Sequence, residues 1–144
     1  MDDFKSKLHD LMLTAVKQNA SDLHLGVGKK PTLRIDGLLV PLERELVTTP
    51  ESAEGLVYAL MTDAQRQQFT ERKEIDFSYS FEDKARFGVN VYQQRGFKAA
   101  ALRFIPNQIR TLEQLGLPTI LRDFTKLSQG FILVVGPAGH GKST

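Results

Sequence analysis

The carboxyl end of the chain carries residues whose types and spacing are suited to holding phosphate groups. A glycine is followed five positions later by Gly-Lys-Ser, which gives the pattern G-x-x-x-x-G-K-[ST]. In such a loop the glycines let backbone N–H groups point at phosphate oxygens, the lysine reaches the terminal phosphates, and the serine hydroxyl binds Mg²⁺. We therefore predict a site for ATP and Mg²⁺, with Lys142 as the catalytic cation and Ser143 as the metal ligand. The predicted loop consists of Gly136, Pro137, Ala138, Gly139, His140, Gly141, Lys142, Ser143 and Thr144.

An apolar run, Phe131 to Val135, stands directly before this loop. A phosphate-binding loop requires a preceding strand, and a strand that is apolar throughout is typical of a parallel sheet covered on both faces. The run therefore predicts a buried strand over residues 131–135. The alternative is a glycine-rich surface turn with an incidental Gly-Lys-Ser sequence, and the apolar context favours the nucleotide site.

The composition is that of a globular chain. With 144 residues, 41% of them hydrophobic, the chain is long enough to bury one core. A net charge of +2 is too small to indicate nucleic acid as the main partner, and the absence of cysteine excludes a disulfide framework. The first residues lack a long apolar run, so we expect neither a signal peptide nor a membrane span.

The amino-terminal part predicts a helix followed by three short strands. Helical spacing of apolar residues gives way to alternation, and Asp36-Gly37 is a strong hairpin turn because both residues tolerate positive φ. The alternation places Asp22 and His24 on the solvent-exposed side of the first strand, where we interpret His24 as a structural hydrogen-bond partner. The predicted elements are a helix over residues 4–19 and strands over 22–27, 32–35 and 38–40.

The middle of the chain predicts two capped helices and an antiparallel sheet. Thr49-Pro50 supplies an N-cap and a first-turn proline, and Thr62 with Gln65 has the spacing of a capping box. The period then changes to two, as in strands with one wet face, and Pro106 stops the last strand. The predicted elements are helices over residues 50–60 and 62–71 and strands over 74–81, 85–91 and 97–105.

Residues 1–105 are therefore predicted to form an α+β domain, an antiparallel sheet with helices on one face. Residues 106–114 are predicted to be a linker, because Pro106-Asn107 breaks the last strand. Residues 115–144 are then the beginning of a second domain, with a helix over 119–127 and the strand before the phosphate-binding loop.

Two strands of this sheet carry arginines that are predicted to lie side by side. If the strands turn at Gln94-Arg95, Arg86 stands directly opposite Arg103, and such a like-charged pair favours an anionic ligand between the two side chains. Small residues on the same face leave room for a ligand, so we predict an anion-binding face with Arg95 nearby. The alternative is a solvated surface whose arginines pair with acidic residues, Glu74 or Asp76, of the neighbouring strand.

In these motifs and their order the chain resembles the hexameric secretion ATPases, in particular the type IV pilus retraction ATPases of the PilT and PilU type. Several short motifs in one order are more specific than any of them alone. The motifs are ASDLHL (20–25), RIDG (34–37), EIDFS (74–78), RFGVN (86–90), QRG (94–96), RFIP (103–106), LEQLGLP (112–118) and the phosphate-binding loop.

The resemblance implies a PAS-like amino-terminal domain (1–105), a linker (106–114) and the start of a RecA-like ATPase core (115–144). It implies that Arg86, Arg95 and Arg103 act as catalytic residues that reach bound ATP when the domains close. It further implies that Leu115 and Leu117 lie near the adenine.

The resemblance also implies a function, as the amino-terminal part of a homohexameric ATP-hydrolysing motor that powers pilus retraction and twitching motility. Such a motor is cytoplasmic, peripheral to the inner membrane, and acts with the inner-membrane platform protein. The alternatives are a pilus assembly or type II secretion ATPase, and a non-enzymatic PAS-like module for subunit packing. No segment matches the Asp box, the Walker B region or the His box of the family, so we expect this chain alone to lack ATPase activity.

Two positions depart from the family pattern. Gly88 stands where relatives often carry a second arginine, in R-F-R-V-N, and the loop has Pro-Ala-Gly-His where Pro-Thr-Gly-Ser is commoner. The number of phosphate-contacting arginines and the side-chain contacts of the loop are therefore expected to differ from those of relatives.

Overall fold

The computed structural model describes residues 2–82, 85–106, 111–136 and 141. The chain divides into two compact units, the amino-terminal unit Met1–Asn107 and the carboxyl-terminal unit Gln108–Thr144. Each unit has its own local structure, and the two are described in turn. None of the helices in the described ranges is long and apolar enough to cross a bilayer.

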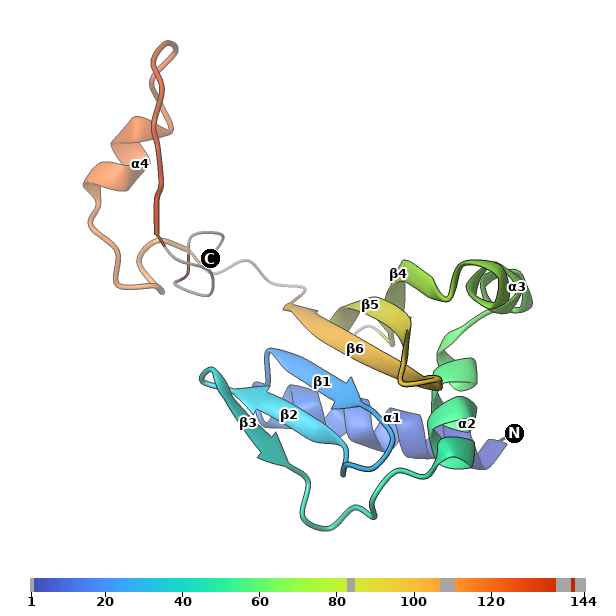
Figure 1. Ribbon diagram of the computed structural model, residues 1–144. Helices are drawn as coiled ribbons and strands as arrows, with labels where there is room; N and C mark the ends of the chain where they lie inside the picture. The colour runs from blue at the N-terminus through green and yellow to red at the C-terminus, as the bar shows by residue number, and fades with distance from the viewer. Residues whose placement is uncertain (1, 83–84, 107–110, 137–140, 142–144) are drawn as a thin grey trace. The chain divides into compact units, whose positions relative to one another are not determined.

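A six-stranded antiparallel sheet forms the amino-terminal unit, with the strand order β3-β2-β1-β6-β5-β4 (Figure 1). The first hairpin turns at Asp36-Gly37, and both residues have positive φ, 48° and 82°, as the two-residue turn requires. This turn is where the sequence predicted it. The strands are β1 Asp22–Leu25, β2 Thr32–Ile35, β3 Leu38–Pro41, β4 Glu74–Phe81, β5 Ala85–Gln94 and β6 Phe97–Pro106.

Three helices accompany the sheet: α1 Asp2–Lys17, α2 Pro50–Leu60 and α3 Asp63–Arg72. The predicted caps of α2 and α3 are both present. Thr49 accepts a hydrogen bond from the backbone N–H of Ser52 and donates its own backbone N–H to the Ser52 hydroxyl, and Thr62 and Gln65 make the same reciprocal pair.

The core lies between the sheet and the helices. α1 and α2 lie on one side of the sheet (Figure 1), and their apolar stripes meet the alternate, inward-facing residues of the strands. Phe87 is fully buried, and its ring packs edge-on against the rings of Phe81 and Phe104, with centroids 6.1 and 5.8 Å away. The predicted α+β class is confirmed by this arrangement. The opposite face of the sheet carries the polar residues of the same strands.

The carboxyl-terminal unit begins with a tight turn over residues 111–117. The backbone N–H of Thr111 donates to Gln114 Oε1, and the Thr111 hydroxyl accepts from the N–H of Gln114. At the end of the turn, Leu117 N–H donates to Leu112 C=O and Gly116 N–H donates to Glu113 C=O, with Gly116 at φ 65°. This is a Schellman motif, in which glycine takes the left-handed position.

Beyond this turn the structure departs from two predictions. The helix predicted over residues 119–127 is limited to α4, Ile120–Phe124. The strand predicted over residues 131–135 is wrong: the segment belongs to no sheet, and its five side chains are 50–86% exposed. A strand needs a neighbour for its N–H and C=O groups, and no described strand pairs with this segment.

Candidate anion-binding site

The hairpin of β5 and β6 turns one residue later than predicted. Arg95 and Gly96 are the two turn residues, with φ 52° and 84°, and Gln94 pairs with Phe97. Arg103 therefore stands opposite Gly88 and not opposite Arg86, so the predicted register was wrong. Because the shift amounts to two residues along one strand, every side chain keeps its face of the sheet. Arg86 and Arg103 remain diagonal neighbours on the face opposite the helices.

Arg103 has a partner that the sequence analysis did not foresee. Its Nε donates to Asp22 Oδ1 at 3.1 Å, across the β1–β6 pairing that places these two residues directly opposite each other. Asp22 also faces Arg34 of β2, with Arg34 Nε 3.5 Å from Asp22 Oδ2. The hydroxyl of Ser21 donates to the same Oδ2 at 2.8 Å. One carboxylate is thus held between two guanidinium groups.

Asp22 is 7% exposed, so the prediction that it lies on a solvated face was wrong. An aspartate on an outer sheet face is covered here because long arginine side chains from both neighbouring strands extend over it. The three residues that make this contact, Asp22, Arg34 and Arg103, could be seen in the sequence, but not that they lie together. Only the pairing of β1 with β6, about 80 positions further on, brings these residues into one row.

Glu74 and Asp76 do not neutralise Arg86 or Arg103, which was the alternative interpretation. Both carboxylates accept from the side-chain amide of Asn90, each at 3.0 Å. Arg86 is exposed and makes no hydrogen bond or ion pair with any described residue. The face therefore holds one unpaired arginine beside one that is paired only through Nε.

Arg95 does not join this group. It is exposed in the β5–β6 turn, at the other end of β5 from Arg86. Nine residue steps separate the two positions, which at about 3.3 Å per residue places them about 30 Å apart. The expectation that Arg95 lies near Arg86 and Arg103 was wrong. Of the three predicted arginines, only Arg86 and Arg103 are near enough to each other to contact the same phosphate group.

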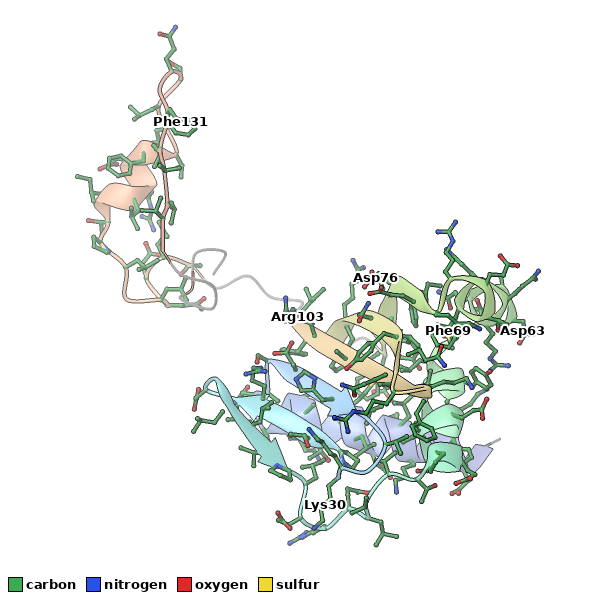
Figure 2. All side chains as sticks on the ribbon, viewed as in Figure 1. Lys30, Asp63, Phe69, Asp76, Arg103 and Phe131 are labelled. Atoms are coloured by element: carbon green, nitrogen blue, oxygen red, sulfur yellow. The ribbon has the colours of Figure 1, made fainter. Side chains whose placement is uncertain are left out.

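An open depression of about 530 Å³ lies on this face of the sheet. Figure 2 labels two of its residues, Arg103 on β6 and Asp76 on β4. A Cβ added at Gly88 would meet only Ile105 Cδ1, at 3.7 Å, which is an ordinary contact. Gly88 therefore leaves open space opposite Arg103. The fold does not require glycine there, because an alanine side chain would fit.

His24 lies on the same face, two residues further along β1 than Asp22, and lines a second cavity of about 360 Å³ with Lys29, Lys30 and Tyr92. Its buried Nε2 has no hydrogen-bond partner among the described residues, so the predicted hydrogen-bonding role is not realised at this atom. Burial lowers the pKa of His24, and the charges of Arg34 and Arg103 lower it further, against an opposing contribution from Asp22. His24 is accordingly neutral at pH 7.

The predicted nucleotide residues of the carboxyl-terminal unit are only partly described. Leu115 is half-buried and Leu117 is 41% exposed, and both belong to the Schellman turn. A hydrogen bond and ion pair joins Glu113 to Arg122 of α4. The hydrogen bond of Glu113 to its own backbone and that to the Thr111 side chain lower its carboxyl pKa, with Arg122 adding to the effect.

Gly136 and Gly141 are exposed, and Gly141 has φ 76°. The other predicted loop residues, Lys142 and Ser143 among them, lie outside the described residues.

The chain has relatives among known proteins. No protein-family model matches the chain. The chain is 39% identical over 140 residues to the type IV pilus retractation ATPase PilT of Pseudomonas aeruginosa, covering 94% of this chain and 39% of that protein. It is 34% identical over 134 residues to the type IV pilus ATPase PilU of the same organism, covering 93% and 35%. A twitching motility protein of Neisseria gonorrhoeae is 36% identical over 118 residues, covering 79% and 30%.

Solved structures give the same picture. A crystal structure of the pilus retraction motor PilT with bound ADP superposes with a TM-score of 0.76 at 38% identity, covering 94% of this chain and 40% of that one. The Legionella pneumophila ATPase DotB superposes with a TM-score of 0.75 at 24% identity, over 92% and 38% of the two chains, and supports the fold alone.

The antiparallel sheet with its helices is thus the fold of the amino-terminal domain of secretion ATPases. Within that class, the chain is homologous to the type IV pilus ATPases of the PilT and PilU type. It spans only 30–40% of the length of these relatives.

Proposed function

We propose that these 144 residues are the amino-terminal part of a hexameric, ATP-hydrolysing motor that powers type IV pilus retraction. The observation that carries the proposal is the match to PilT over 94% of the chain, in sequence and in fold, together with the intact G-x-x-x-x-G-K-[ST] pattern. Under this proposal residues 1–105 are the PAS-like domain, 106–114 the linker and 115–144 the start of the RecA-like core. The motor works at the cytoplasmic face of the inner membrane, on the platform protein of the pilus.

The chemistry follows from the residue types. Lys142 holds the terminal phosphates of ATP, and the hydroxyl of Ser143 offers Mg²⁺ the hard oxygen ligand that it prefers. Arg86 and Arg103 meet the phosphates from the outer face of the sheet, where catalysis of phosphoryl transfer consists of positioning and charge stabilisation. Arg95 lies at the far end of the hairpin, so it cannot contact the same phosphate group as Arg86 and Arg103. Leu115 and Leu117 flank the adenine.

A chimera tests the motor function. Residues 1–144 replace the corresponding segment of P. aeruginosa PilT, and the chimera is assayed for ATP hydrolysis and for restoring twitching to a strain that lacks PilT. We expect both activities, and we expect Lys142→Ala to abolish them. A folded hexameric chimera without ATPase activity would contradict the proposal. Hydrolysis without twitching would instead favour a pilus assembly or type II secretion ATPase.

The 144-residue chain by itself is proposed to lack ATPase activity, since it has no segment that matches the Asp box, Walker B region or His box. Turnover by the purified chain that disappears in Lys142→Ala would overturn this. The alternative of a non-enzymatic packing module gains if the chain associates with itself while ATP leaves its melting temperature unchanged, because a ligand that binds only the folded state must raise that temperature.

A further inference from the structure

We propose that Asp22 is a positioning residue for Arg103: its carboxylate fixes the guanidinium group by Nε and so directs the two terminal nitrogens toward the phosphates of ATP. The inference rests on the proposed function, since ATP is the anion concerned. It adds Asp22, a residue of the ASDLHL segment, to the arginine site. Although the negative charge of Asp22 repels phosphate, we infer that Asp22 promotes the reaction with ATP.

The geometry of Arg103 is the first support. Only Nε is bonded, to Asp22 Oδ1 at 3.1 Å, and neither terminal nitrogen donates to any described residue. The Arg103 side chain is 77% exposed, so these nitrogens are open to solvent and to a ligand. A guanidinium group offers phosphate two parallel N–H donors at its end, and a partner at Nε leaves that end free. Asp22 and an anion therefore occupy different donors of the same side chain.

The setting of Asp22 is the second support. Oδ2 is occupied by Arg34 Nε at 3.5 Å and by the Ser21 hydroxyl at 2.8 Å, which orients Oδ1 toward Arg103. The Asp22 side chain is only 10% exposed, so it has little freedom to turn away. A fixed carboxylate restricts the many rotamers of an exposed arginine before the ligand arrives, and such preorganisation raises affinity or rate without a new ligand contact.

The balance of charge is the third support. One carboxylate faces two arginines, so the row of Arg34, Asp22 and Arg103 keeps a net positive charge and still attracts an anion. By charge alone, Asp22 repels phosphate, and its removal should improve ATP binding. By orientation, its removal should impair the site. The two explanations predict opposite signs for one substitution.

Asp76 supplies the matched control. It lines the same depression, but its carboxylate accepts from Asn90 and makes no hydrogen bond or ion pair with Arg103. Asp22→Asn and Asp76→Asn each remove one negative charge from this face. In the PilT chimera, we expect Asp22→Asn to reduce kcat/KM for ATP about tenfold or more, the scale of a misplaced reacting group. We expect Asp76→Asn to leave kcat/KM the same or raise it.

A double substitution separates orientation from a general loss of stability. Arg103→Lys keeps the positive charge, and because the position is exposed the substitution should not disturb the fold. Lysine has no Nε–H group, so a carboxylate cannot hold it there while its terminal nitrogen stays free for a ligand. Adding Asp22→Asn to Arg103→Lys should reduce kcat/KM no further if Asp22 acts only through Arg103. Equal additional loss in both backgrounds, or a gain in kcat/KM from Asp22→Asn alone, would overturn the inference.

Nuclear magnetic resonance of the arginine Nε–Hε groups tests the same contact without any catalysis. In the 144-residue chain, the Arg103 Nε–Hε signal should be shifted and slow to exchange with water, and Asp22→Asn should abolish both properties. The chimera reports on the proposed function separately, because an inactive wild-type chimera counts against the motor and not against the contact. An Arg103 signal identical in wild type and Asp22→Asn would refute the positioning role.

Discussion

The two units of the chain bury their apolar residues to very different extents. In the amino-terminal unit the alternate residues of the strands and one stripe of each long helix meet in one core, and Phe87, Leu23 and Val57 are fully buried. In the carboxyl-terminal unit the equally apolar run from Phe131, labelled in Figure 2, to Val135 is exposed along its whole length. An apolar run is therefore buried only where other helices or strands pack against it, as they do around Phe87 but not along residues 131–135.

The largest expected effect contrasts two phenylalanines. Phe87→Ala removes a ring that is fully buried between two other rings, and it should reduce the free energy of unfolding by about 3–5 kcal/mol. Phe131→Ala removes a ring that is 86% exposed and should change that free energy by less than about 0.5 kcal/mol. Urea unfolding followed by circular dichroism measures both. A comparable loss from Phe131→Ala would show that the apolar run is buried in solution.

The second effect contrasts two glycines. A Cβ at Gly55 of α2 would lie 2.5 Å from the Phe4 ring of α1, so Gly55→Ala forces either the Phe4 ring or the two helices to move. Helix propensity alone predicts a gain in stability from this change. We expect instead a loss of about 1–3 kcal/mol from overpacking, measured by the same unfolding assay. Gly88→Ala is the control, with its nearest contact at 3.7 Å, and Phe4→Leu should partly restore Gly55→Ala.

The third effect contrasts equivalent caps in the two units. Thr62 is the N-cap of α3 and Thr111 begins the turn of the carboxyl-terminal unit, and both make the same pair of hydrogen bonds with a glutamine three positions later. Thr62→Ala should cost about 1 kcal/mol of unfolding free energy. Thr111→Ala should leave the main unfolding transition unchanged, because that transition belongs to the amino-terminal core. A shift of this transition by Thr111→Ala would show that the units unfold together.

Local signals were enough to predict most of the amino-terminal unit. The Asp36-Gly37 turn, the N-cap of α2, the capping box of α3 and the alternation of β4 and β5 each depend on a few neighbouring residues, and all are present. The second hairpin was placed one residue too early. Gly96 was the signal for the correct turn, because the second turn position requires positive φ and glycine adopts it without strain.

The candidate site was less predictable, because its contacts join distant segments. The same-face placement of Arg86 and Arg103 survived the register error, since strands have a period of two. The burial of Asp22 did not follow from its own strand, whose alternation placed it in solvent. It depends on Arg34 and Arg103 reaching Asp22 from the two neighbouring strands. The distance of Arg95 from the other arginines likewise follows from the length of the hairpin rather than from composition.

The smallest expected effect uses pH to compare a half-buried titratable group with an exposed one. Burial holds the pKa of His24 below its ordinary value of 6.5 in the folded state. The unfolded chain therefore binds a proton more readily than the folded chain as pH falls through 6.5. Stability should accordingly decrease on acidification from about pH 6.5 downward, and it should level off below the folded pKa, once both states are protonated.

His24→Gln removes this titration, and its unfolding free energy should vary less with pH in that window than that of the wild type. The matched measurement is Glu113→Gln in the carboxyl-terminal unit, whose carboxyl is exposed, so that solvent screens its interactions. It should leave the pH dependence of the main transition unchanged. If His24→Gln and wild type show the same slope, the desolvation of His24 is relieved in solution, and the outer face of the sheet around Arg34 and Arg103 is more open to water than the structure shows.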